Sequence, residues 1–269
     1  MFINTNVGAM NAHRNLVFNN TAMNKSMEKL SSGYRINRAA DDAAGLAISE
    51  NMRYQINGMT QAQRNANDGI SLIQTAEGAL TETHAMLQRL NTLANQASNG
   101  IYDGTDRAKI QEEVDQLMEE IDNIAKNTSF NGIKLLDNTN TTVFQVGSNA
   151  GEQISVTNGD MTAATLGVNA LDVTTSAGAQ TAMNSIKAAI STVSEQRATF
   201  GAVQNRLEHT INNLGVNIEN LSAAHSRIKD ADMAKEMTTF TKNQILVQAG
   251  TSMLAQANSV PQNVLKLLG

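Results

Sequence analysis

The strongest pattern in the chain is a seam of mostly apolar residues that advances in alternating steps of three and four. Its positions are Met183, Ile186, Ile190, Val193, Arg197, Phe200, Gln204, Leu207, Ile211, Leu214, Ile218, Leu221, His225 and Ile228. This spacing places the seam on one face of a helix, and a sustained heptad repeat is typical of a coiled coil. Because such a helix needs partners of similar length, the pattern predicts further long helices beside it.

Two more helices with strong apolar stripes are predicted before this seam, over residues 66–98 and 107–128. A shorter, alanine-rich helix is predicted over residues 39–59, where small side chains allow another backbone to approach closely. The scarcity of proline fits long helices, since the single proline is Pro261.

Weaker apolar tracks mark both ends of the chain. The N-terminal track, over residues 3–30, contains Ile3, Val7, Met10, Val17, Met27 and Leu30. The C-terminal track, over about residues 233–258, contains Met233, Met237, Phe240, Val247 and Leu254. We expect Pro261 to end the second helix, and an up-and-down arrangement would bring residues 1–40 beside residues 229–269.

The stretch from residue 130 to residue 180 has a different character. A turn at residues 130–132 is followed by two predicted strands, residues 142–146 and 153–157, joined by a glycine-containing loop. Residues 158–180 show no period, and we expect them to form a surface-exposed excursion. The predicted fold class is therefore mainly α, a long antiparallel helical coiled-coil rod with a small β-hairpin region at one end.

Composition narrows the function. The chain has no cysteine, which excludes disulfides and thiolate metal sites. Aromatic residues make up 3% of the chain, too few for base stacking or for an aromatic membrane-binding face. We expect no nucleic-acid partner, no membrane span and no cleavable secretory signal.

No constellation of polar residues indicates catalysis or metal binding. The four histidines, His13, His84, His209 and His225, lack the spacing of metal ligands. The acid pairs at residues 112–113 and 119–120 repeat on one helical face and are typical of a solvated surface. An enzyme is therefore the weaker hypothesis, and we expect no cofactor. A structural rod whose end helices have not buried their apolar tracks implies a partner, and a second copy of the chain is the simplest one.

Several long motifs resemble those of bacterial flagellin. They are LSSGYRINRAADDAAGLAI at residues 30–48, NDGISLIQTAEGAL at 67–80, FNGIKLL at 130–136, AVQNRL at 202–207, MLAQAN at 253–258 and PQNVL at 261–265. The likeness covers about residues 1–137 and 183–269. Only about 45 residues separate these halves, so the chain resembles a minimal flagellin without the family's large outer domains.

The resemblance implies a subunit that self-assembles head-to-tail into the flagellar filament. Its terminal helices, residues 1–42 and 229–269, would form the inner layer (D0) and order on polymerisation. Residues 43–182, with a short variable excursion at about 138–182, and residues 183–228 would form the outer rod (D1). The alternative within the superfamily is the hook–filament junction protein.

The resemblance also implies partners. These are the type III export apparatus, an export chaperone on the C-terminal segment, and the filament cap and hook–filament junction proteins. The product would be secreted to the extracellular flagellum filament. Toll-like receptor 5 recognises some flagellins, and the matching positions here are Arg89, Leu93 and Glu113. The alternative reading of these three residues is a buried Leu93 beside a surface ion pair.

Overall fold

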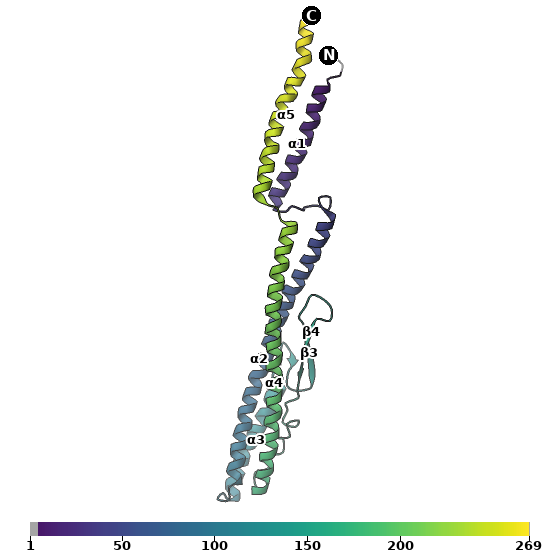
Figure 1. Ribbon diagram of the computed structural model, residues 1–269. Helices are drawn as coiled ribbons and strands as arrows, with labels where there is room; N and C mark the ends of the chain where they lie inside the picture. Colours follow the sequence, from purple (N-terminus) through teal and green to yellow (C-terminus); the bar gives the residue numbers. More distant parts are fainter. Residues whose placement is uncertain (1–4, 269) are drawn as a thin grey trace. The chain divides into compact units, whose positions relative to one another are not determined.

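Long helices account for most of the chain, as Figure 1 shows. The computed structural model describes residues 5–268, and the side chains of residues 5–259. The helices are α1 (Val7–Ser32), α2 (Ala43–Ser98), α3 (Gly104–Asn127), α4 (Ser176–Lys229) and α5 (Met233–Leu268). The strands are β1 (Ser129–Phe130), β2 (Ile133–Lys134), β3 (Asn140–Gln145) and β4 (Gln153–Asn158). The expected mainly α fold with a small hairpin region is confirmed.

The chain divides into two compact units, each of which takes its residues from distant parts of the sequence. The terminal unit holds the residues up to Tyr54 and those from Glu219 onward, and it contains α1 and α5. The central unit is Gln55–Ile218. Helices α2 and α4 contribute residues to both units.

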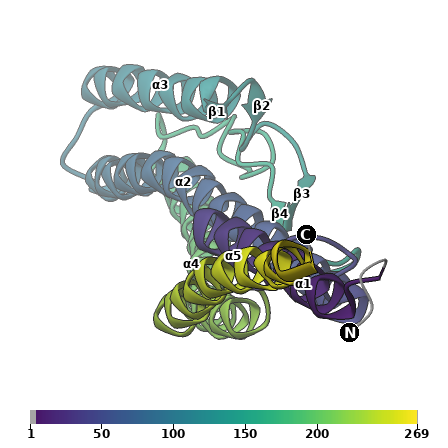
Figure 2. The ribbon, with the colours of Figure 1, turned by 90° about the horizontal axis from the view of Figure 1, so that it is seen from above.

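The core of the central unit is built where α2, α3 and α4 face one another. Fully buried positions include Leu80, Leu87, Leu90, Val114, Ile121, Ile186, Val193, Phe200 and Leu207. The predicted seam of α4 is confirmed, because none of its fourteen positions is exposed. In Figure 2, which is seen from above, α3 lies beside α2. Leu, Ile, Val and Ala dominate this core, and Phe200 is its one fully buried aromatic side chain among the described residues.

The β3–β4 hairpin packs on glycines of α2. Its strands pair antiparallel, with Phe144 opposite Ile154, and buried side chains alternate along β4. A Cβ atom at Gly69 would stand 3.1 Å from the Phe144 ring, and one at Gly58 would stand 2.8 Å from the Ser148 Cβ. Glycine at these two positions therefore lets the hairpin lie directly against the helix.

The turn predicted at residues 130–132 joins β1 to β2. Phe130 pairs with Ile133, and the two residues between them have positive φ, 49° at Asn131 and 80° at Gly132. An Asn-Gly pair in this conformation makes a two-residue hairpin turn whose twist matches that of its strands. The two residues that follow β2, Leu135 and Leu136, are buried in the core.

The expectation that residues 158–180 form a surface-exposed excursion is wrong. Between β4 and α4, in the segment of residues 159–175, six apolar side chains are buried, namely Met161, Ala163, Leu166, Val168, Leu171 and Val173. The Gln111 side chain of α3 holds it, because its Nε2 donates to the Leu171 carbonyl and its Oε1 accepts from the Val173 N–H, both at 2.8 Å. The segment has no regular backbone, so its burial left no period in the sequence.

Three predicted helix limits also need correction. The helices expected at 39–59 and 66–98 are one helix, α2, since residues 60–65 contain no proline or glycine and continue it without a break. Helix α4 begins at Ser176, inside the expected excursion. Helix α5 continues past Pro261 to Leu268, so this proline lies within the helix and does not end it.

Candidate assembly surface

Helices α1 and α5 pack against each other in antiparallel orientation within the terminal unit (Figure 1). Near one end of the pair, Asn6 Nδ2 donates a hydrogen bond of 2.8 Å to the Ala257 carbonyl. Further along, a Cβ atom at Gly250 would lie 3.3 Å from Leu16 Cδ1. These two contacts fix which turns of the helices lie opposite each other.

The least exposed residues of the pair form two regular seams. On α1 they include Ala9, Ala12, Leu16, Asn19, Met23, Ser26 and Leu30, and on α5 they include Glu236, Phe240, Asn243, Val247, Gly250, Leu254 and Ala257. Both runs advance by alternating steps of three and four, as in a coiled coil. Small and polar residues fill many of these positions, and Ser26 and Asn243 are buried.

Large apolar residues of the same two helices lie outside this seam and are exposed. They are Val7, Met10, Val17, Phe18 and Met27 on α1, and Met233, Met237, Ile245, Leu246 and Met253 on α5. Phe18 is 73% exposed and Met10 is 64% exposed. We call these ten residues the outer apolar surface.

The structure divides the terminal residues that the sequence singled out. Phe240, Val247 and Leu254 lie in the seam between α1 and α5. In contrast, Val7, Met10, Val17, Met27, Met233 and Met237 belong to the outer apolar surface. Ile3 lies outside the described residues. The sequence prediction therefore combined residues of both faces, and it missed the small and polar seam residues, which the 3/4 spacing of Ala, Ser, Asn and Gly would have indicated.

A cluster of polar contacts lies at the end of α1 and the start of α5. It joins the loop between α1 and α2 to the end of α4. The Arg35 N–H donates to the Lys229 carbonyl at 2.7 Å, and Lys229 Nζ lies 2.9 Å from Glu50 Oε1 and over the Tyr34 ring. The hydrogen bond from Lys229 is the main cause that lowers the pKa of Glu50. The cluster therefore fixes where α1 and α5 begin their pairing.

The two carboxylates just before α2 have different partners. Asp41 pairs with Lys25 at 2.8 Å, and that hydrogen bond, aided by the Arg38 N–H, lowers the pKa of Asp41 to about 2. Asp42 instead accepts from the Gly45 N–H at 2.8 Å and caps the start of α2. Both carboxylates therefore hold the loop between α1 and α2 and the first turn of α2.

The three residues at the predicted receptor site do not share one surface. Leu93 is 2% exposed and belongs to the central core. Arg89 and Glu113 form an exposed ion pair between α2 and α3, with Nη2 and Oε1 at 2.7 Å. Only this ion pair is accessible at the surface.

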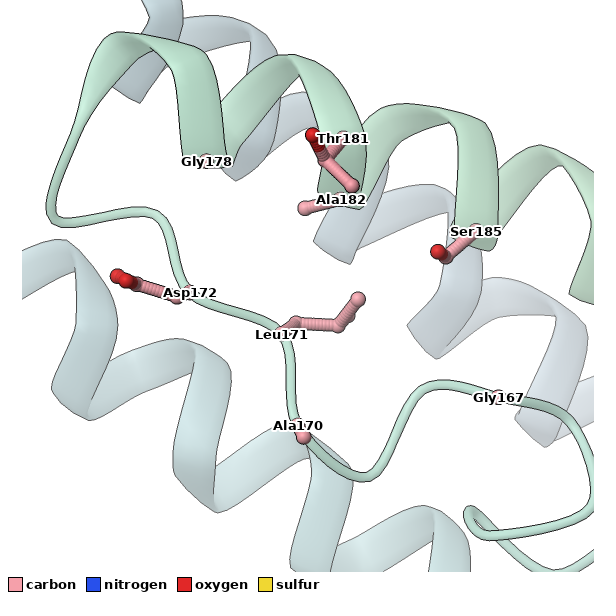
Figure 3. Close-up of a pocket in the computed structure, with 8 residues that line it drawn as sticks. All are labelled: Gly167, Ala170, Leu171, Asp172, Gly178, Thr181, Ala182 and Ser185. Atoms are coloured by element: carbon pink, nitrogen blue, oxygen red, sulfur yellow. The ribbon is translucent and has the colours of Figure 1, made fainter.

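The described residues line several cavities. Figure 3 shows one of about 240 Å³, where Leu171 points toward the turn of α4 that carries Ala182. Its one carboxylate is Asp172, whose pKa is lowered by hydrogen bonds from the Thr174 side chain and backbone. A carboxylate held ionised in this way is a poor general acid.

Metal binding has no support in the part of the chain that the structure describes. No group of three or more His, Asp or Glu side chains there could hold a metal ion. Among the helices so described, none has the length and apolar character needed to cross a bilayer. The most unusual chemical feature of the described surface is therefore the exposed apolar side chains of α1 and α5.

Comparison with protein families gives two matches. Residues 3–141 match the bacterial flagellin N-terminal helical region, and residues 183–268 match the bacterial flagellin C-terminal helical region. The unmatched stretch between them holds most of β3, all of β4, the buried irregular segment and the first turns of α4.

Relatives align with the chain over its full length. It is 55% identical to the flagellin of Bacillus subtilis and 56% identical to that of Halalkalibacterium halodurans, with 100% of both chains covered in each case. It is 50% identical to the flagellar filament 33 kDa core protein of Treponema phagedenis, again over 100% of both chains.

Solved structures agree with these relationships. The Bacillus cereus flagellin crystal structure is 34% identical, covers 56% of this chain and 88% of its own, and gives a TM-score of 0.51. A flagellar hook-associated protein from Vibrio parahaemolyticus gives a TM-score of 0.61 over 71% of this chain and 100% of its own, but at 15% identity it shows the fold alone. The alternative of a hook–filament junction protein is therefore not favoured, and this chain belongs to the bacterial flagellin family.

Proposed function

We propose that this chain, a structural subunit of the flagellar filament and not an enzyme, polymerises through the outer apolar surface of α1 and α5. Flagellins are filament proteins, and the relative from Treponema phagedenis is named a filament core protein. The observation that supports the proposal is the exposure of ten large apolar side chains on two paired helices. Exposed apolar patches of this kind mark protein interaction sites.

The distribution of polar and apolar residues over the α1–α5 pair supports contact with further copies of the chain. Small and polar residues occupy much of the α1–α5 seam, whereas Val17, Phe18 and Met27 point elsewhere. In a fibre, neighbouring subunits would cover these side chains on more than one side. A head-to-tail contact of this type does not close on itself, so it generates an open helix of subunits.

The same distribution supports ordering of the terminal helices on polymerisation. Fixing one backbone residue costs roughly 1–2 kcal/mol. A seam with Ala12, Ser26 and Gly250 among its members offers little apolar area to offset that cost. Subunit contacts on the outer apolar surface would supply the remainder, so folding of the ends and binding are coupled.

The partners implied by the family resemblance fit this account. An export chaperone would shield the C-terminal segment, where Met237, Ile245 and Met253 are exposed. The chain would leave the cell through the type III export apparatus and assemble beneath the filament cap, beyond the hook–filament junction proteins. The mature protein is then extracellular, in the flagellum filament.

Toll-like receptor 5 is the further partner that the resemblance implies. The exposed Arg89–Glu113 ion pair is the part of that site that a receptor can contact. Leu93 would act indirectly, because its buried side chain packs α2 into the core that supports the pair. We therefore expect Arg89→Ala to weaken recognition without unfolding the chain.

Seeded elongation tests the proposal. The variant with Val17→Gln and Phe18→Gln changes two exposed side chains and leaves the neighbouring seam residues Leu16 and Asn19 in place. We expect far-ultraviolet circular dichroism close to that of the parent, together with elongation slowed by roughly tenfold or more. Ile101→Gln, at an exposed apolar position outside α1 and α5, is the control and should elongate normally.

A normal elongation rate for the Val17/Phe18 variant would contradict the proposal. An equal loss in the Ile101 variant would show that any exposed apolar residue matters. Either result would remove the special role of the terminal helices.

A further inference from the structure

The outer apolar surface is rich in methionine. Five of its ten residues are Met10, Met27, Met233, Met237 and Met253, in a chain with 13 methionines in all. Met10 and Met253 lie toward the end of the α1–α5 pair where Asn6 meets Ala257. The other three lie in the last turns of α1 or the first turns of α5. Methionine side chains therefore cover part of this surface near both ends of the pair.

Methionines elsewhere in the described part of the chain are shielded. The five on the outer apolar surface are between 47% and 64% exposed, whereas Met59 and Met161 in the central unit are 8% and 4% exposed. The half-buried ones are Met23, Met52, Met86, Met118 and Met183. Every exposed methionine among the described side chains therefore belongs to α1 or α5.

The composition of the chain directs an oxidant to these side chains. Cysteine and tryptophan are both absent, so methionine is the only sulfur-containing residue and peroxide meets no thiol that would react first. When the thioether sulfur attacks one oxygen of hydrogen peroxide, an S–O bond forms and the O–O bond breaks. The sulfur is oxidised by two electrons to a sulfoxide. The second oxygen takes up the proton of the transferred one and leaves as water.

We propose that these five methionines make the outer apolar surface an oxidant-sensitive modification site, at which hydrogen peroxide converts the free subunit to a form that does not polymerise. The inference rests on the proposed function, because the side chains matter only if neighbouring subunits cover them. A sulfoxide is polar and chiral, and it replaces a flexible apolar side chain that adapts to its neighbours. Burying the sulfoxide against apolar groups costs free energy unless its oxygen accepts a hydrogen bond.

The modification acts on the free subunit and is reversible. Before assembly the five side chains are open to solvent, and peroxide reaches them directly. In a fibre the neighbouring subunits would cover them and protect them. Methionine sulfoxide reductases return a sulfoxide to the thioether, so an oxidised subunit can regain its ability to polymerise.

Peptide mass spectrometry of peroxide-treated monomers tests where the chemistry occurs. We expect sulfoxide to form at the five exposed positions at least about fivefold faster than at Met59 and Met161. The central unit stays folded during a short treatment, so its buried methionines serve as internal controls. Oxidation of Met59 or Met161 as fast as that of Met253 would show that exposure on α1 and α5 does not select the site, and would overturn the proposal.

Seeded elongation by oxidised subunits tests the consequence. Monomers are treated with peroxide, separated from it and mixed with untreated parent seeds. We expect the critical concentration to rise by roughly tenfold or more, and sulfoxide reductases should return it to within about threefold of the untreated value. Normal elongation by subunits that carry the five sulfoxides would overturn the proposal, and so would a loss that the reductases do not reverse.

Leucine variants locate the effect within the chain, because leucine is close to methionine in size and has no sulfur. The test variant carries Met10→Leu, Met27→Leu, Met233→Leu, Met237→Leu and Met253→Leu. Peroxide should leave its critical concentration within about threefold of the same variant's untreated value. The control carries Met86→Leu and Met118→Leu, at two half-buried positions packed on the central core, and should keep the full sensitivity of the parent.

Two results with these variants would contradict the proposal. If peroxide impairs the five-leucine variant as strongly as the parent, the sensitive residue lies elsewhere, as at Met23 in the α1–α5 seam. If the control loses its sensitivity, the effect comes from the central unit.

The variant with Val17→Gln and Phe18→Gln separates this inference from the proposed function, because it alters the same surface and keeps all five methionines. Impaired elongation of that variant, together with normal elongation by the oxidised parent, would overturn the methionine inference and leave the proposed function standing. Normal elongation of that variant would remove the proposed function and this inference with it.

Discussion

Lys229 and Glu50 form an ion pair of 2.9 Å that joins the end of α4 to the second turn of α2 within the terminal unit. Lys229 is 9% exposed, and its ammonium group also lies 5.3 Å from the centre of the Tyr34 ring. Its carbonyl accepts from the N–H groups of Arg35 and Ile36. One residue thus connects α4, the α1–α2 loop and α2 at the base of the α1–α5 pair.

Removing the carboxylate of this pair should destabilise the terminal unit. Glu50→Gln leaves the largely buried Lys229 ammonium without its counter-charge, which costs more than loss of a surface ion pair. We expect a lower midpoint of chemical denaturation, monitored by circular dichroism at pH 7. Glu219→Gln, at an exposed position of α4, is the control, and equal midpoints for the two variants would contradict this role of Lys229.

Asp41 should make stability depend on pH in the acid range. Its pKa is about 2 in the folded chain against an ordinary 3.8, chiefly through the hydrogen bond from Lys25. A lowered folded pKa means that its contribution is present above the ordinary value and is lost as the pH falls through about 2.

The denaturation midpoints of the parent and Asp41→Asn should therefore differ at pH 6 and converge near pH 2. The comparison uses one buffer series and the same denaturant. A difference that stays constant down to pH 2 would show that Asp41 contributes nothing through its charge.

A charge placed in the α4 seam should unfold the central unit. Leu214 is buried, and Leu214→Asp would bury an unpaired carboxylate at a cost of roughly 3 kcal/mol or more. Val216, two residues along, is 58% exposed, so Val216→Asp should be close to neutral. Similar thermal midpoints for the two variants would contradict the assignment of this seam to the core.

The sequence predicted best where large apolar residues alone mark the buried face. The α4 seam could be derived in full, since Phe200, Leu207 and Leu214 keep one register throughout. For the same reason, a buried Leu93 could be given as an alternative from the sequence. The β3–β4 hairpin was also predictable, because glycine-containing loops between alternating segments are strong signals.

The candidate assembly surface was less predictable, because there large apolar residues do not mark the buried face. On α1 and α5 ten large apolar residues are exposed, and the intrachain seam contains Ala12, Ser26 and Asn243. Apolar periodicity follows large side chains, so it combined residues of the outer apolar surface with seam residues such as Phe240 and Val247. The burial of the segment around Val168 was not predicted for another reason. An irregular buried segment has no hydrophobic period to detect.

Glycine spacing on α2 should control how well the β3–β4 hairpin packs. Gly58→Ala would place a methyl group 2.8 Å from the Ser148 Cβ and 3.2 Å from its Cα, so we expect a loss of about 1–3 kcal/mol. Gly78→Ala in the same helix meets nothing within 4 Å and should gain about 0.5–1 kcal/mol from helix propensity.

Thermal unfolding of the two glycine variants tests whether their changes in stability have opposite signs. Both substitutions bring the same gain in helix propensity, so their difference reports the contact with the hairpin. A Gly58→Ala variant as stable as Gly78→Ala would mean that the hairpin does not rest on α2.

The central claim is that the terminal helices are the assembly element, and seeded elongation of a chain lacking residues 235–269 tests it most directly. Fibre length is measured by electron microscopy after parent seeds are mixed with the truncated chain. We predict a soluble chain whose circular dichroism remains strongly helical, because the core of residues 55–218 is untouched, and no growth of the seeds. Elongation at the parent's rate would contradict the account.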